Sequence, residues 1–234
     1  MRRLIYAILV VSLLPLSAFA AEKPRLAVVD FRNDTSAGWW YGGAGRDLAS
    51  MLTNELASDE KFRLVEREKL NAVLEEQDLA TSGRVSQKTA AKFGKMTGAQ
   101  YIVTGAVSAF EQQTQGGGGG LSFHGISVGG KKDDAYIAVD IRVVDTTTGE
   151  VVHTRTVEAR STSYGVAVGA SRGGLAGGLS KYSNTPTGKA IRACLVEVSE
   201  YLGCVMVDQD DCTAAYSAKE KSRREKDKKA IKIE

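Results

Sequence analysis

The sequence is poor in the residues from which many catalytic and metal-binding sites are built. Its 234 residues include two histidines, three cysteines and three prolines. His124 and His153 stand alone, without cysteine or acidic neighbours at the spacing of zinc ligands. No Gly-Lys pair is followed by Ser or Thr, as a P-loop requires. The sequence therefore predicts a protein that is not an enzyme and that needs no metal or cofactor.

Long apolar runs and a basic face are also missing. After residue 20 no segment approaches the ~18 consecutive apolar residues that a transmembrane helix needs. The formal charge is +3, and the last 16 residues alone carry eight basic and four acidic side chains. Because the charge is concentrated at the end of the chain, nothing indicates a surface that binds nucleic acid.

The first 20 residues have the pattern of a removable signal peptide. Arg2 and Arg3 form a short positive region, and an apolar run over 4–16 follows. Small residues then stand at Ala18 and Ala20, the arrangement that signal peptidase recognises. We therefore expect an exported protein in the periplasm, with outer-membrane association as an open alternative.

Strand and helix patterns alternate between residues 25 and 105, which is typical of an α/β domain. The apolar run 25–31 predicts a buried strand, and Leu48, Leu52 and Leu56 recur at helical spacing. Taken together, the patterns predict strands at 25–31, 62–65 and from 101, and helices containing 48–56, 70–74 and 86–96.

The second half of the chain is dominated by strand patterns. Residues 138–143 alternate apolar and polar, a turn follows over 145–150, and 151–159 returns, which predicts a hairpin. Thr185 followed by Pro186 predicts the start of a last helix, whose apolar stripe continues to Val205. The expected fold is a mixed α/β sheet domain with flanking helices.

The cysteines and the charged tail complete the predicted organisation. Cys204 and Cys212 flank the acidic turn 208–211, and we expect a disulfide there, with free thiols as the alternative. The predicted divisions are a signal peptide over 1–20, one domain over 21–207 and a charged tail over 208–234. We expect this tail to be a solvated helix or a disordered extension.

Two glycine-rich stretches, within 107–137 and 157–184, have an unusual pattern. In the second, Tyr164, Val166 and Val168 alternate with glycine and alanine. One face of such a strand would be apolar, and the other would carry only very small side chains. Each stretch could be a hairpin with arms of about ten residues, the length of a tilted membrane strand. One hairpin cannot span lipid with unpaired edges, so a pore would require several subunits. Surface loops are the alternative, because glycine runs usually indicate flexibility.

Several segments together resemble the CsgG family of curli secretion channels. The strongest is 138–152, with its Arg-Val-Val centre and Thr-Gly-Glu turn. The others are 25–31, 65–77 and 98–105, in the same order and at similar spacing. The resemblance implies a periplasmic α/β domain with two hairpin insertions that close an oligomeric transmembrane β-barrel. The stretches 107–137 and 157–184 fall where those hairpins belong.

The resemblance also suggests a pore constriction, with two departures from the family pattern. In the channels a loop after the first strand narrows the pore with aromatic and amide side chains. Here that loop, about 33–45, is shorter, and Trp39, Trp40 and Tyr41 are the candidates; packing on the domain surface is the alternative. Channel members are acylated at an N-terminal cysteine, whereas the first cysteine of this chain is Cys194.

Two functions follow as hypotheses. The first is a ring-forming, protein-conducting secretion component of the outer membrane, with a secreted or envelope protein as its partner. The second is a soluble periplasmic module that binds protein and activates or scaffolds a cell-envelope assembly.

Overall fold

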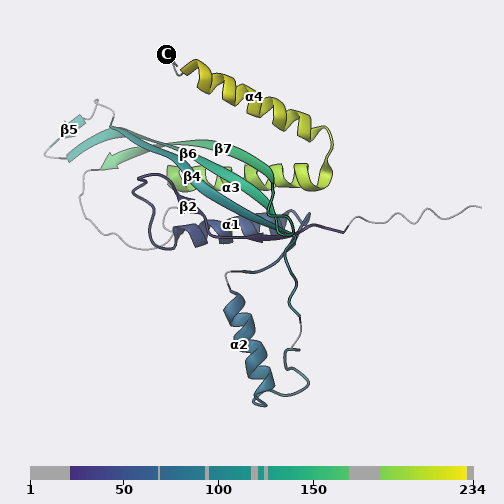
Figure 1. Ribbon diagram of the computed structural model, residues 1–234. Helices are drawn as coiled ribbons and strands as arrows, with labels where there is room; N and C mark the ends of the chain where they lie inside the picture. Colours follow the sequence, from purple (N-terminus) through teal and green to yellow (C-terminus); the bar gives the residue numbers. More distant parts are fainter. Residues whose placement is uncertain are drawn as a thin grey trace, which may run out of the picture.

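The computed structural model describes residues 22–67, 69–92, 95–116, 121–123, 126–168 and 185–230. The predicted signal peptide and residues 169–184 of the second predicted hairpin lie outside these ranges. Figure 1 shows a curved sheet with helices packed against it, a separate helix below and a long helix above. The strands are β1 (Arg25–Val28), β2 (Arg32–Asn33), β3 (Arg63–Leu64), β4 (Tyr101–Gly116), β5 (Leu121–Phe123), β6 (Ile126–Asp145) and β7 (Val151–Val168).

The sheet is mixed, as the sequence predicts. Its order is β3-β1-β4-β6, with β7 on the other side of β6, β2 beside β4 and β5 beside β6. The pairs β1–β3, β1–β4 and β2–β4 are parallel, whereas β4–β6 and β6–β7 are antiparallel. The predicted hairpin is present, since β6 and β7 are joined by the turn that begins at Asp145.

Helices α1 (Ala44–Ser58) and α3 (Pro186–Gly203) form the core together with the sheet. Leu48, Leu52 and Leu56 are buried on one face of α1, which confirms the predicted stripe. At the start of α3 the Thr185 side chain accepts a hydrogen bond from the Gly188 amide at 3.1 Å. This cap satisfies an amide that has no partner inside the helix, and the proline beside it suits the first turn.

Helix α2 (Leu70–Thr81) has the predicted apolar spacing but no buried residue. It stands away from the sheet, below the rest of the molecule in Figure 1. The predicted helix over 86–96 is wrong: its described residues form only a turn, in which the amides of Thr89 and Ala90 donate to the Ser86 carbonyl. None of the described side chains from 82 to 92 is buried, so no packing stabilises a helix there.

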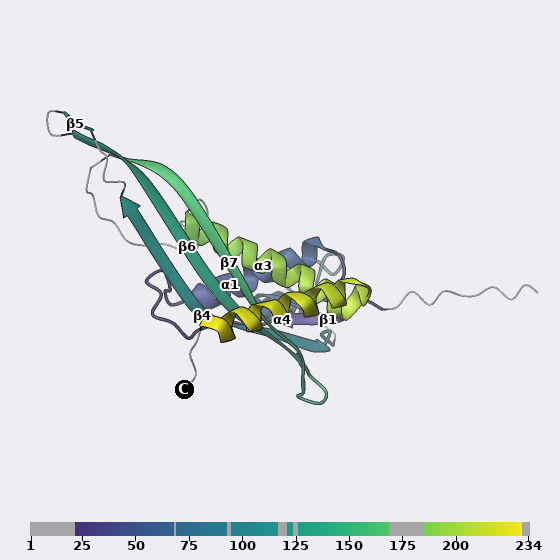
Figure 2. The same cartoon turned by 90° about the horizontal axis from the view of Figure 1, so that it is seen from above.

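The last helix, α4 (Cys212–Ala230), follows α3 through one π-helical turn, η2 (Cys204–Asp208). It lies on the far side of the sheet from α1, and the view from above shows it crossing over the strands (Figure 1 and Figure 2). No residue of α4 is buried. Within the described ranges, no helix has both the length and the apolarity to cross a membrane.

Candidate functional site: a strand ribbon with two open edges

Strands β4, β6 and β7 continue well beyond the part of the sheet that α1 covers. We call this extension the ribbon; it comprises residues 108–116, 126–138 and 158–168. Its register is continuous, from Ala109 opposite Ala138 to Gly116 opposite Lys131, and from Glu158 to Val168 along β7. A bulge between Val107 and Ala109 marks the point where β4 enters the ribbon. Bulges increase local twist and turn a strand, and Figure 2 shows the strands leaving the body together.

The outer edges of the ribbon carry no described strand partner. Before the ribbon begins, β4 pairs with β1 at 101–103 and with β2 at 106–107. From residue 108 onward its only described partner is β6. On the other side, β7 pairs with β6 alone along the part that the structure describes. An exposed row of amides and carbonyls is a template for pairing with another chain. Among the described residues, the ribbon therefore has two different edges without a strand partner.

The three aromatic candidates for a constriction lie in the loop before α1. This loop is near the foot of the ribbon, by which we mean the end around Phe110 where the ribbon joins the rest of the sheet. Trp39 is buried. The centroid of its ring lies 5.8 Å from that of Phe110 in β4, in an edge-on contact, and 5.5 Å from that of Trp40, whose ring is tilted. Trp40 and Tyr41 pack against the core but keep part of their surface exposed, and the Tyr41 hydroxyl donates to Asp47. Trp39 thus anchors the loop, and the exposed aromatic surface belongs to its two neighbours.

A band of polar side chains crosses the ribbon above this foot. The described residues 111–114, 132–134 and 160–163 are all polar, on both faces of the strands. Thr162 donates to Asp134 at 2.6 Å, and Lys132 pairs with the same carboxylate at 2.8 Å. The hydrogen bond from Lys132, followed by that from Thr162, lowers the pKa of Asp134. Sequence reasoning missed this band, although the polar run at 111–115 signals it.

The predicted lipid-facing residues come directly after the polar band. Tyr164, Val166 and Val168 lie in β7, with backbone partners at Lys132, Gly130 and Val128 of β6. The strand that the alternating pattern predicts is therefore present up to residue 168.

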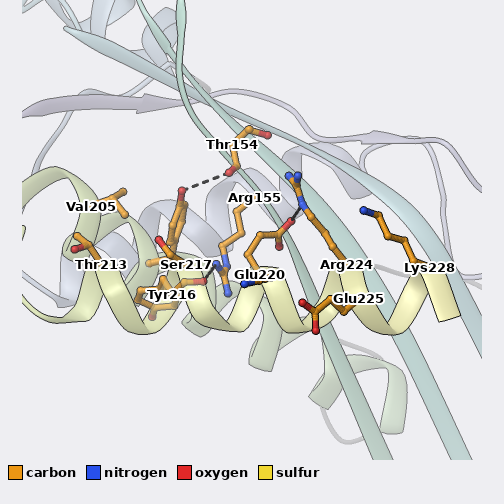
Figure 3. A pocket seen from close by; sticks show the side chains of 12 residues that line it. Thr154, Arg155, Val205, Thr213, Tyr216, Ser217, Glu220, Arg224, Glu225 and Lys228 are labelled. Atoms are coloured by element: carbon orange, nitrogen blue, oxygen red, sulfur yellow. Dashed lines mark hydrogen bonds and ion pairs between the residues drawn. The ribbon is translucent and has the colours of Figure 1, made fainter.

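Helix α4 is fastened beside the lower part of β7, mainly by one buried arginine. Arg155 is 8% exposed, and its guanidinium lies between the rings of Tyr201 (5.1 Å) and Tyr216 (4.7 Å). It donates to the Tyr216 carbonyl at 3.2 Å and faces Glu197 at 3.8 Å. Figure 3 shows this arrangement at the wall of a groove of about 550 Å³. Among the described atoms, Nε of Arg155 has no hydrogen-bond partner.

Charged contacts continue this attachment along α4. Lys219 pairs with Glu197, and Arg223 approaches Glu158 of β7 at 4.0 Å. The hydrogen bond from Arg223 is the main cause that lowers the pKa of Glu220 to about 2; burial opposes it, and the hydrogen bond from Arg224 adds to the lowering. The helix is therefore held across the sheet, near β7, by polar contacts rather than by a buried apolar face.

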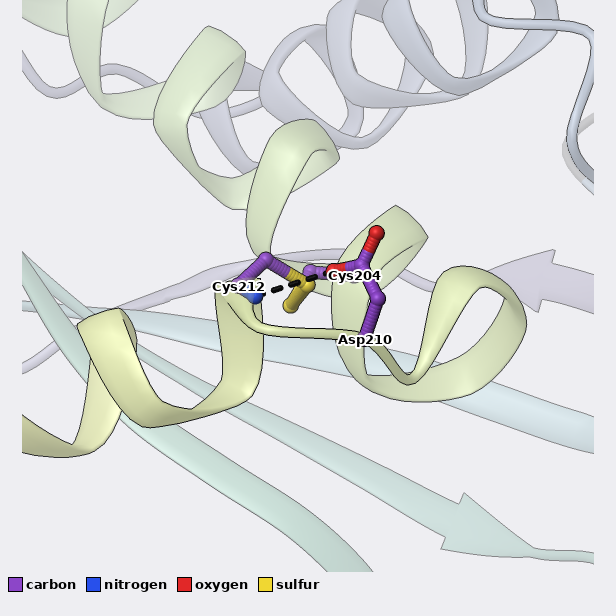
Figure 4. A group of neighbouring side chains, drawn as sticks. All are labelled: Cys204, Asp210 and Cys212. Atoms are coloured by element: carbon purple, nitrogen blue, oxygen red, sulfur yellow. Dashed lines mark hydrogen bonds between the residues drawn. A yellow bond between two sulfur atoms is a disulfide. The ribbon is translucent and has the colours of Figure 1, made fainter.

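The junction between α3 and α4 carries a disulfide. Cys204 and Cys212 are bonded, with their Cα atoms 6.0 Å apart, and Asp210 accepts the Cys212 amide at 2.9 Å (Figure 4). Cys204, Asp210 and Cys212 lie close together, but both sulfurs are used by the disulfide, so this group offers no thiolate to a metal. Cys194 is free and buried, and desolvation is the main cause that raises the pKa of its thiol to about 12. It therefore stays protonated and unreactive at neutral pH.

Comparison with known proteins gives one family and several distant structures. The family model described as "Curli production assembly/transport component CsgG" matches residues 10–231. Proteins of that description from Salmonella typhimurium and Escherichia coli K12 are each 27% identical over 131 residues, which is 54% of this chain and 47% of theirs. The chain thus spans about half the length of the curated relatives it matches.

Solved structures resemble the chain more weakly. The hypothetical protein CT253 from Chlamydia trachomatis has a TM-score of 0.43 and 14% identity, with 79% of this chain and 98% of CT253 covered. A PelC dodecamer from Paraburkholderia phytofirmans has a TM-score of 0.29 and 18% identity, with 75% and 85% covered.

Proposed function

Because the chain belongs to the CsgG family, we propose that it is an exported secretion or assembly component of the cell envelope that forms an oligomeric, protein-conducting pore. The family description concerns assembly and transport rather than catalysis. The observation that carries the proposal is the ribbon with its two open edges. Copies joined edge to edge along their ribbons would continue one sheet around a ring.

Physical limits on strands in lipid support this use of the ribbon. An isolated ribbon would leave edge amides and carbonyls unpaired in the hydrocarbon, at several kcal/mol each, so closure by neighbouring copies is required. A membrane strand needs about 9–11 residues. Such strands would begin after the polar band, near residue 164, and the band itself would remain in water.

A pair of cysteine variants on one strand face tests the proposal. Val166→Cys places a thiol on the predicted lipid-facing side, and Thr162→Cys, on the same face of β7, places one in the polar band. Cys194 is buried and the other two cysteines are bonded, so the added thiol dominates labelling. In outer membranes washed with alkaline carbonate, we expect Cys at 166 to react with a lipid-phase reagent and Cys at 162 with a water-soluble one.

The same experiment distinguishes the second candidate, a soluble periplasmic module that binds an envelope protein. The polar band favours that candidate, since it shows that much of the ribbon is suited to water on both faces. Release of the protein by the carbonate wash, with both thiols labelled equally by the water-soluble reagent, would support the module and reject the pore.

A further inference from the structure

The groove beside α4 is a concave polar surface that plays no part in the pore proposed above. It is lined by Thr154 and Arg155 of β7, by Tyr201 of α3 and by one stripe of α4. Its volume of about 550 Å³ lies within the range of about 300–1,000 Å³ that is usual for ligand sites. Figure 3 shows Arg224 and Lys228 extending from α4 toward the strands. The groove thus has the size and the side chains of a binding site.

Helix α4 uses separate faces for its attachment and for the groove. Lys219 and Arg223, four residues apart, make ion pairs that hold the helix to the rest of the chain. Lys221, Arg224 and Lys228 are spaced by three and four residues, so they share another face, and all three line the groove. The attachment of α4 therefore leaves a basic face directed into the groove.

The groove has more positive than negative charge, and part of the positive charge is unpaired. Arg155 and Arg224 already face carboxylates of the chain. Lys221 and Lys228 have no ion pair with any residue that the structure describes. Seven residues separate them, which places them two helical turns (~10.5 Å) apart along α4. A ligand with at least two separated anionic groups would therefore complement this face.

Strand β7 adds backbone groups to the groove. Along its described length it has no strand partner on the side away from β6. The Thr154 carbonyl accepts from the Tyr201 hydroxyl of α3 at 3.4 Å, which is longer than the ~2.5–3.0 Å of a usual hydroxyl bond. In an antiparallel strand the amide and carbonyl of one residue point to the same side. Thr154 can therefore offer a donor and a weakly used acceptor to an extended chain, as in strand addition.

We propose that this groove binds an extended acidic segment of a partner protein, with its carboxylates at Lys221 and Lys228 and its backbone at Thr154. A densely charged polyanion, such as a membrane surface or a nucleic acid, fits less well, because Glu220 and Glu225 also line the groove and would repel it. A peptide carries its carboxylates between neutral groups, so it can reach the lysines and avoid these acids. The groove lies within a single chain, so the inference does not depend on the pore.

Fluorescence anisotropy of a labelled peptide tests the proposal. The probe is a ten-residue peptide in which Glu and Asp alternate with Val and Thr, and its counterpart carries Gln and Asn instead of the acids. We expect the acidic peptide to bind the purified protein, and Lys221→Gln with Lys228→Gln to weaken it at least about fivefold. Lys226→Gln with Lys229→Gln is the matched control, since it removes the same charge from exposed positions of α4 that do not line the groove. The control should leave the affinity within about twofold of wild type.

Amide hydrogen exchange locates the bound peptide. Binding should slow exchange in β7 around 152–156 and in α4, and should leave α1 unchanged. Three results would overturn the proposal: equal weakening by the two lysine pairs, an acidic peptide that binds no better than its amide counterpart, or binding only to phosphatidylglycerol vesicles. None of these results bears on the carbonate test, and a protein that the carbonate wash releases should still bind the peptide, so the groove and the pore fail separately.

Discussion

Gly105 shows how tightly one residue can be specified by the core. It lies in β4 beside Phe31, and a Cβ atom at this position would come 2.3 Å from Cε1 and 2.6 Å from Cδ1 of the ring. Phe31 is only 4% exposed, so its ring has little room to move. Gly105→Ala should therefore lower the free energy of unfolding by ~1–3 kcal/mol, the usual cost of overpacking.

The control for this prediction is Gly98→Ala. A Cβ at residue 98 would meet no atom within 4 Å, so we expect a change of under about 0.5 kcal/mol. Urea denaturation of both variants measures the difference. Equal midpoints would show that the Phe31 ring relaxes and that the close approach carries no cost.

Arg155 illustrates a residue whose role its sequence context only partly reveals. It lies on the same, core-facing side of β7 as Val157 and Ala159, where an aliphatic residue is expected. A charge at such a position predicts a buried partner, which is the only signal that the sequence gives. The partners, Tyr201, Tyr216 and Glu197, come from two later helices. Since long-range tertiary packing brings them together, the local pattern cannot name them.

At the scale of elements, prediction succeeded where a periodic apolar face meets a partner. The spacing of apolar residues predicted α1, the Thr185 cap followed by Pro186 predicted the start of α3, and the turn after Asp145 predicted the β6–β7 hairpin. The same rules predicted a helix over 86–96, which is absent because nothing packs against it. They found α2 without revealing that it stands apart. The open edges of the ribbon could not be predicted either, because pairing depends on which strands lie side by side.

Helix α4 should respond to acid before the rest of the domain does. Its Glu220 has a pKa lowered from 4.5 to about 2 by Arg223 and Arg224. A carboxyl whose pKa is lower in the folded state stabilises the fold fully above pH 4.5. That contribution is lost progressively as the pH falls from 4.5 through 2. We therefore expect α4 to loosen over this window while α3, which is held by apolar packing, stays ordered.

Amide hydrogen exchange, corrected for the intrinsic pH dependence, measures this difference between the two helices. Glu220→Gln is the diagnostic variant: it should make α4 exchange several-fold faster at neutral pH and remove most of the acid response, as exposed pairs contribute roughly 0.2–1 kcal/mol. Equal acid sensitivity of α3 and α4 in the wild-type chain would contradict the prediction.

At the scale of the whole molecule, the two ribbon edges that lack a described partner differ, and the edge-to-edge assembly proposed above would use this difference. An interface that joins unlike surfaces repeats without a two-fold axis and closes into a ring when the rotation allows it. The lower half of β4 is already paired with β1 and β2, whereas the contact of β7 with α4 is made by side chains such as Arg155. On the β4 side, pairing between copies would thereby be restricted to the ribbon, which is the part that a pore would place at and in the membrane.

The loop before α1 is where such a ring would narrow, because it lies at the foot of the ribbon. Trp39 is buried against Phe110, so Trp40 and Tyr41 carry the aromatic surface that remains exposed. If this surface faces the lumen, Trp40→Ala with Tyr41→Ala should widen the neck and raise the single-channel conductance in planar bilayers. Trp39→Phe keeps the anchor apolar and aromatic and should leave the conductance unchanged. Unchanged conductance in the double variant would remove both residues from the constriction and would place the narrowest point elsewhere along the ribbon.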